Sequence, residues 1–85
     1  MKLNIDKTGN TYRCTILGEV YDYGWYKSGK AFIAKDGVLL SLAEARRLFV
    51  PYSCFNSRRE FVAGGRKYKN NMDGFVRSLI HRYNR

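Results

Sequence analysis

Hydrophobic and polar positions alternate along most of residues 1–40, and a period of two is typical of β-strands. Gly18, Ser28-Gly29 and Asp36-Gly37 interrupt the pattern, and Asp36-Gly37 is a preferred pair for the type I′ turn of a hairpin. We therefore predict an antiparallel meander with strands at 11–17, 19–26, 30–35 and 38–40. A short strand at 2–5 could pair with the first of these.

The predicted strand 19–26 carries Tyr21, Tyr23 and Trp25 on one face, because successive side chains of a strand point to opposite sides. Aromatic rings on an exposed sheet face stack on bases in many proteins that bind single strands. The opposite face, with Asp22 and Gly24, is the poorer surface to bury. Since the rest of the chain needs an apolar sheet face to pack on, we expect the three aromatic residues to belong to the core.

After Leu40 the hydrophobic period changes to 3.6 residues, which is typical of an α-helix. Ser41 and Glu44 have the spacing of a capping box, in which each side chain binds a backbone N–H that the helix leaves unpaired. Pro51 disfavours helical geometry at Val50, so this helix should end near Phe49. Its predicted apolar face consists of Leu42, Ala45, Leu48 and Phe49.

Two further helices are predicted in the second half of the chain. Ser57 and Glu60 repeat the capping-box spacing, so Asn56 or Ser57 could begin a short helix that ends at Gly64-Gly65. Asn70 or Asn71 could cap a last helix that continues to about Tyr83. The apolar side of that helix would contain Phe75, Val76, Leu79, Ile80 and Tyr83.

Together these elements predict an α+β fold, with an antiparallel sheet of three to four strands packed by two to three helices. The chain has 85 residues, which is enough for a single small domain (1–85) close to the lower limit for one hydrophobic core. Residues 1–40 would form the meander, and residues 41–85 would form a basic helical half.

Charge is distributed unevenly between these halves. The chain has 16 Lys and Arg and 7 Asp and Glu, for a net charge of +9. Residues 1–45 contain six cations and five anions, whereas residues 46–85 contain ten cations and two anions. An excess of +8 in one half is typical of a region that faces a polyanion, although an ordinary solvated surface is the simpler alternative.

The segment 56–69 is the strongest candidate for a binding site, because it places five cations around Gly64-Gly65. A glycine pair lets the backbone approach a phosphate closely, and Tyr68 could stack on a base. In the first turn of the predicted short helix, Arg58 and Arg59 would oppose the helix dipole, which an external anion would relieve. The predicted nucleic-acid-binding cations are Arg46, Arg47, Arg58, Arg59, Arg66, Lys67, Lys69, Arg77 and Arg82.

No arrangement of residues in the sequence is typical of an enzyme. His81, the one histidine, lies in the basic last helix away from any carboxylate in sequence, and we expect it on the surface of that helix. A magnesium-dependent nuclease that uses Asp22, Asp36 and Glu60 is the enzymatic alternative. With two cysteines and no Cys-x-x-Cys spacing, Cys14 and Cys54 predict reduced core thiols, and we expect no metal and no cofactor.

The sequence also gives expectations for the cellular location of the protein and for its binding partners. No apolar stretch reaches the length of a membrane span, and the N-terminus does not have the pattern of a signal peptide, so we expect an intracellular, cytoplasmic protein without membrane contact. The leading hypothesis is a small basic protein that binds DNA or RNA without catalysis. The alternatives are a virus-encoded or accessory inhibitor that docks on an acidic host protein or a nucleic-acid-processing complex, and a basic subunit of a larger particle.

Overall fold

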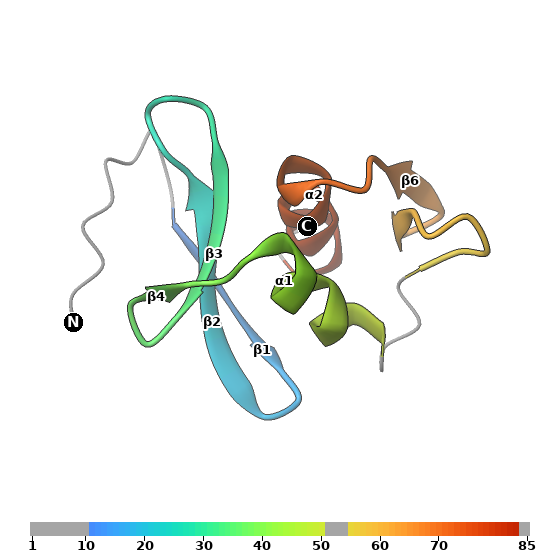
Figure 1. Cartoon of the computed structure of the whole chain (residues 1–85). Helices are drawn as coiled ribbons and strands as arrows, with labels where there is room; N and C mark the ends of the chain where they lie inside the picture. Colours follow the sequence, from blue (N-terminus) through green and yellow to red (C-terminus); the bar gives the residue numbers. More distant parts are fainter. Residues whose placement is uncertain (1–10, 51–54, 84–85) are drawn as a thin grey trace.

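The computed structural model describes residues 11–50 and 55–83 (Figure 1). Its first part is an antiparallel sheet in which each strand pairs with the next one in the chain, so the predicted meander is confirmed. The possible strand at 2–5 lies outside the described residues. The four strands are β1 (Tyr12–Ile16), β2 (Glu19–Trp25), β3 (Ala31–Lys35) and β4 (Val38–Leu39).

Two-residue turns connect β1 to β2 and β3 to β4 and set the register of these two pairs. Lys35 pairs with Val38 across Asp36-Gly37, and these turn residues have φ angles of 52° and 79°, as a type I′ turn requires. Leu17 was expected in the first strand but lies in the same kind of turn, since Ile16 pairs with Glu19. These turns match the right-handed twist of the strands and keep one face of the sheet continuous.

Two of the three predicted helices form where the sequence predicts them. The helix α1 (Leu42–Phe49) begins with a capping box, in which Glu44 N donates to Ser41 Oγ at 3.2 Å and Ser41 N donates to Glu44 Oε1 at 3.1 Å. The helix α2 (Met72–Tyr83) begins at Asn71, whose Oδ1 accepts a hydrogen bond of 2.7 Å from Gly74 N. Each cap satisfies backbone donors that the first turn leaves unpaired.

The predicted short helix between Ser57 and Gly64 is wrong, because this segment leads into a β-hairpin. The strands β5 (Phe61–Ala63) and β6 (Arg66–Tyr68) are antiparallel, with Ala63 paired to Arg66. Gly64 and Gly65 have φ angles of 57° and 81° and form the two-residue turn between them. A glycine pair can end a helix or turn a hairpin, and here it turns a hairpin.

Asn56 explains why the capping-box spacing is misleading in this segment. Its Oδ1 accepts hydrogen bonds of 3.0 Å from Arg58 N and from Glu60 N, and its Nδ2 donates to Glu60 Oε1 at 2.8 Å. Glu60 is thus held in a side-chain-stabilised turn and does not cap a helix. Arg58 and Arg59 therefore do not oppose a helix dipole, and the prediction that an external anion relieves such an unfavourable interaction is wrong.

Figure 1 shows α2 between the four-stranded sheet and the β5–β6 hairpin, and α2 contacts β3, β5 and β6. On the sheet, Tyr23 and Ile33 are fully buried partners across β2 and β3. Away from the sheet, Phe49 of α1 packs against Phe75 of α2, with ring centroids 4.3 Å apart, and Phe61 of β5 lies 5.2 Å from Phe75. Burial of each phenylalanine contributes about 2 to 3 kcal/mol, so this cluster fixes the hairpin on the helices.

The core predictions for the second strand hold in part. Tyr21 and Tyr23 are buried, whereas Trp25 is only half-buried.

Cys14 is a buried free thiol, as expected, and Cys54 lies outside the described residues. The described part of the chain contains no helix that is both long and apolar enough to cross a membrane. The predicted α+β class therefore holds: residues 11–50 and 55–83 form two helices, with a hairpin where the third helix was predicted.

Candidate functional site

The hairpin presents Arg66 and Tyr68 on one face and Lys67 on the other, because side chains alternate along β6. Arg66 and Tyr68 pair with Ala63 and Phe61, which are both buried. Arg66 and Tyr68 thus share the face of the hairpin that packs on α2. Lys67 starts from the other face, but it also lines a hollow with Asp73 and Arg77 of α2. One face of β6 therefore carries a cation and an aromatic ring, and the other carries a cation alone.

The helix α2 contributes a stripe of side chains that lies beside this hairpin. Asp73, Arg77 and His81 are four residues apart, so they follow one another on the same side of the helix. The buried side of α2 is formed by Phe75, Val76 and Leu79. The amphipathic pattern that fixes the helix in the core also determines which polar side chains face the hairpin.

Asp73 connects this stripe to the sheet. Trp25 Nε1 donates a hydrogen bond of 2.9 Å to Asp73 Oδ1, and Arg77 Nε lies 3.0 Å from Asp73 Oδ2. The indole ring at the end of β2 is therefore held beside the guanidinium group of α2. One carboxylate positions an aromatic ring and a cation from two different elements.

Two adjoining hollows form where β2, β6 and α2 meet. The larger has a volume of about 390 Å³ and the smaller about 300 Å³, and Tyr68 and Arg77 line both of them. The larger is also lined by Trp25, Arg66, Ile80 and His81, and the smaller by Lys67, Lys69, Asp73 and Gly74. We call this region the β6–α2 site: the cations Arg66, Lys67, Lys69 and Arg77 with the rings of Trp25, Tyr68 and His81.

Close backbone contacts hold the walls of the site together. A side chain at Gly64 would overlap the imidazole of His81, so the hairpin turn packs directly against α2. A side chain at Gly74 would overlap the carbonyl of Lys69, so the first turn of α2 packs against the segment that follows β6. Glycine at both positions permits these approaches. The hairpin and the helix are therefore joined at both ends of the site.

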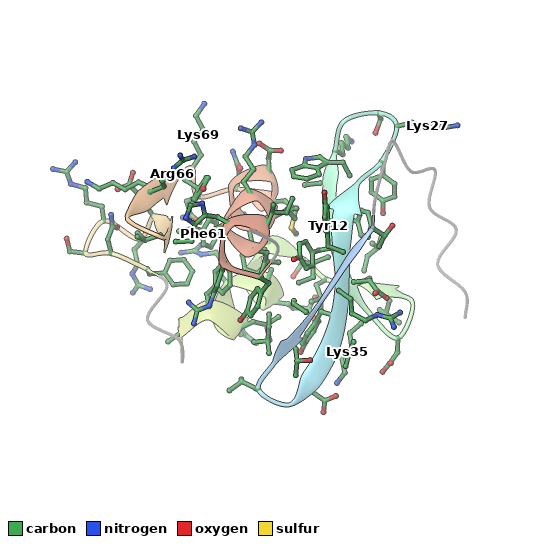
Figure 2. The ribbon with its side chains drawn as sticks, turned by 180° about the vertical axis from the view of Figure 1, so that it is seen from behind. Tyr12, Lys27, Lys35, Phe61, Arg66 and Lys69 are labelled. Atoms are coloured by element: carbon green, nitrogen blue, oxygen red, sulfur yellow. The ribbon has the colours of Figure 1, made fainter. Side chains whose placement is uncertain are left out.

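Three of the four cations in the β6–α2 site have no carboxylate partner among residues 11–50 and 55–83: Arg66, Lys67 and Lys69 form no ion pair there. Their side chains are exposed, and Figure 2 shows Arg66 and Lys69 on the hairpin side of the molecule. Lys27 and Lys35 extend from the four-stranded sheet instead (Figure 2). The unneutralised charge of this region is available to an external anion.

The remaining predicted cations belong to other parts of the molecule. Arg46 and Arg47 of α1 line a hollow of about 200 Å³ together with Arg59, and Arg58 precedes Arg59 in the same exposed loop. We call these four residues the α1–loop arginines. Arg82 lies near the end of α2, with its guanidinium carbon 5.7 Å from the centre of the Tyr83 ring. The single basic face predicted from the sequence is thus divided between at least two hollows.

Trp25 and His81 were not predicted as site residues. The sequence indicated a core position for Trp25 and a solvent-exposed helix position for His81, but both are half-buried and line the larger hollow. The position of Trp25 at the end of its strand, beyond the two buried tyrosines, was the available signal. The contact between Gly64 and His81 depends on tertiary packing, for which the sequence gives no local signal.

The acids considered for a nuclease do not converge. Asp22 on β2 pairs with Arg13 at 3.0 Å, Asp36 lies in the β3–β4 turn, and Glu60 is bound to Asn56. In the part of the chain that the structure describes, no three His, Cys, Asp or Glu side chains are grouped so that they could hold a metal ion. These three acids do not form a shared site.

The β6–α2 site therefore combines flat rings, which can stack on planar groups, with cations that can bind phosphates. No protein-family model, curated protein or solved structure matches the chain.

Proposed function

We propose that this protein binds nucleic acid through the β6–α2 site and catalyses no reaction. The observation that supports this most strongly is the combination of four cations and three aromatic rings around two adjoining hollows. Phosphate groups account for the cations, and bases account for the rings.

The distribution of charge supports the same proposal. The half of the chain that contains the hairpin and α2 has ten cations and two anions. One of those anions, Asp73, holds Trp25 and Arg77 in place within the site. A region with this excess would attract a polyanion before any specific contact forms, which increases the rate of association.

Salt dependence of binding tests this proposal. Affinity for a single-stranded or duplex oligonucleotide is measured by fluorescence anisotropy over a range of salt concentrations. Four phosphate contacts predict that log affinity falls linearly with log salt, with a slope of about −3. Affinity that does not change with salt, or no binding at low salt, would contradict the proposal.

A second candidate function, docking on an acidic protein, is favoured by the hollow beside α1. This hollow combines Arg46, Arg47 and Arg59 with the apolar side chains of Val50 and Phe55. An acidic segment with an apolar anchor residue would complement it in charge and polarity. The partner could be a host protein or a component of a nucleic-acid-processing complex.

The two candidates are separated by their dependence on different arginines. A protein partner that stays bound after nuclease treatment, and that is lost when Arg46, Arg47 and Arg59 are replaced by glutamine, supports the second candidate. Retention that disappears with nuclease treatment, and that depends on Arg66 and Lys67, supports the first.

A further inference from the structure

We propose that the larger hollow of the β6–α2 site holds an unpaired nucleobase, so that the preferred ligand is single-stranded nucleic acid. This inference rests on the proposed function and specifies its substrate class. It concerns the aromatic part of the site, whereas the proposed function depends first on its cations. Base binding can therefore fail while phosphate binding holds.

The composition of the hollow favours a planar ligand. Three of its six lining residues, Trp25, Tyr68 and His81, have aromatic rings, and Ile80 adds an apolar side chain. The hollow is largely open to solvent and has a volume of about 390 Å³, so a planar ligand would stack on its wall and would not be enclosed. A base in a duplex is covered by its neighbours and cannot enter such a pocket, whereas a base in a single strand can turn outward and stack on a ring.

The rings that line the hollow are held in place by contacts within the protein, but Tyr68 and His81 are not stacked on each other. Tyr68 and His81 have centroids 6.5 Å apart and an angle of 55° between their planes. By contrast, Tyr12 and Tyr23 in the core are stacked, with centroids 5.6 Å apart and an angle of 25°. The hydrogen bond to Asp73 fixes the indole of Trp25. Tyr68 and His81 are thus not stacked on each other, and a third planar group would contact the parts of these rings that line the hollow.

The cations continue from this hollow along a path suited to a phosphate backbone. Arg66 and Arg77 line the same hollow as the rings, and Lys67 and Lys69 line the smaller hollow that adjoins it. A strand with one base in the larger hollow can place its neighbouring phosphates over the smaller one. Such alternation of stacking and charge is typical of proteins that bind single strands with little sequence preference.

The walls of the hollow are also pre-organised. The turn at Gly64 packs against His81, and the Asp73 carboxylate connects β2 to α2. Three elements are thereby held around the hollow before any ligand arrives. Binding a base would then cost little additional ordering of the protein.

Trp25 provides a direct measurement, because it is the only tryptophan of the chain. The full chain is titrated with three oligonucleotides of about 12 nucleotides, a length within the range of single-strand sites: a single strand, an abasic backbone of equal charge, and a duplex. The single strand is used as DNA and as RNA. We expect the single strand to quench Trp25 fluorescence and to bind about 10-fold or more tightly than the abasic backbone, as one stacked base predicts.

The outcomes distinguish this inference from the function on which it rests. Equal affinity for all three ligands, without a change in Trp25 fluorescence, would overturn base binding and leave phosphate binding intact. Failure to bind any of the ligands at low salt would overturn both. Quenching by either DNA or RNA single strands supports the inference, because both present the same stacking surfaces.

A pair of variants connects the result to the hollow. Tyr68→Leu removes a ring from its wall, and Tyr26→Leu removes a ring that contacts Phe32 on the sheet, away from the hollow. We expect Tyr68→Leu to reduce affinity for the single strand about 5-fold or more and to leave affinity for the abasic backbone unchanged. Tyr26→Leu should change neither. Equal losses for the single strand and the abasic backbone in Tyr68→Leu would contradict the inference.

Discussion

Trp25 and Asp73 are 48 positions apart in the chain and are joined by a hydrogen bond of 2.9 Å from the indole Nε1 to the carboxylate Oδ1. The bond attaches the end of β2 to the first turn of α2. The same carboxylate lies 3.0 Å from Nε of Arg77, whose side chain is largely exposed. The two interactions of Asp73 therefore differ in solvent exposure and should differ in strength.

We expect Asp73→Ala to lower the free energy of unfolding by about 1 to 2 kcal/mol, because it leaves the half-buried indole N–H of Trp25 without its acceptor. Arg77→Ala should lower it by no more than about 0.5 kcal/mol, since exposed ion pairs contribute little. Urea unfolding followed by circular dichroism measures both. In a Trp25→Phe background the cost of Asp73→Ala should decrease, and an undiminished cost there would show that the hydrogen bond is not its cause.

The packing of Gly64 against His81 gives a second prediction. Gly64→Ala should destabilise the protein by about 2 kcal/mol or more, because it combines a positive φ with overlap on the imidazole. Gly65→Ala is the matched control, since Gly65 also has a positive φ but a side chain there would meet open space. It should cost only about 1 kcal/mol.

The imidazole can be tested separately in the same background. In a His81→Ala protein, the cost of Gly64→Ala should fall to that of Gly65→Ala, because the overlapping ring is absent. Thermal or urea unfolding of the parent, the three single variants and the Gly64→Ala/His81→Ala double variant gives the comparison. If the excess cost of Gly64→Ala persists without the imidazole, the hairpin does not contact α2 in the way described.

Most of the fold could be predicted from local signals. The capping box of Ser41 and Glu44 and the Asp36-Gly37 turn act over a few residues, and both appear in the structure. The segment from Asn56 to Gly64 could not be predicted in this way, because its capping-box spacing and its glycine pair are compatible with a helix and with a hairpin. Burial of Phe61 against the helices decides between them, and that contact depends on tertiary packing.

The cations of the candidate site could be predicted from the sequence, but the grouping of Trp25 and His81 with them could not. Arg66, Lys67 and Lys69 are close in sequence, so their grouping could be seen directly. Trp25 lies about forty residues from Arg66 in the chain, and only the packing of β2 and β6 around α2 brings the two to one hollow. Single-sequence patterns carry no information about such distant contacts.

Alkaline conditions should destabilise the protein. Burial, with a smaller contribution from the negative charge of Asp22, raises the pKa of Cys14 from 9.0 to about 12. Burial also raises the pKa of Tyr23. Between about pH 9 and 12 the unfolded chain therefore loses the Cys14 proton while the folded chain keeps it, so stability is complete below about pH 9 and falls as the pH rises.

Each such group decreases stability by about 1.4 kcal/mol per pH unit within its own interval. Urea midpoints measured at about pH 8 and about pH 10.5 test this in the parent chain and in Cys14→Ala. The variant should be less stable at about pH 8, because a buried side chain is truncated, but it should lose less stability than the parent between the two pH values. An equal loss in the two proteins would show that Cys14 does not titrate as its burial predicts.

The central claim is that nucleic acid binds at the β6–α2 site, and two variants of equal charge test it most directly. One replaces Arg66, Lys67, Lys69 and Arg77 with glutamine, and the other replaces the α1–loop arginines with glutamine, so each removes four positive charges. Circular dichroism and thermal unfolding establish that both retain the fold. Affinity for a single-stranded oligonucleotide is then measured over a range of salt concentrations.

We predict that the β6–α2 variant loses about 100-fold or more of its affinity at low salt and that its salt slope approaches zero. The α1–loop variant should lose less than about 10-fold and keep most of its slope, because its arginines act only through long-range attraction. Equal losses in the two variants, or a larger loss in the α1–loop variant, would contradict the assignment of binding to the β6–α2 site.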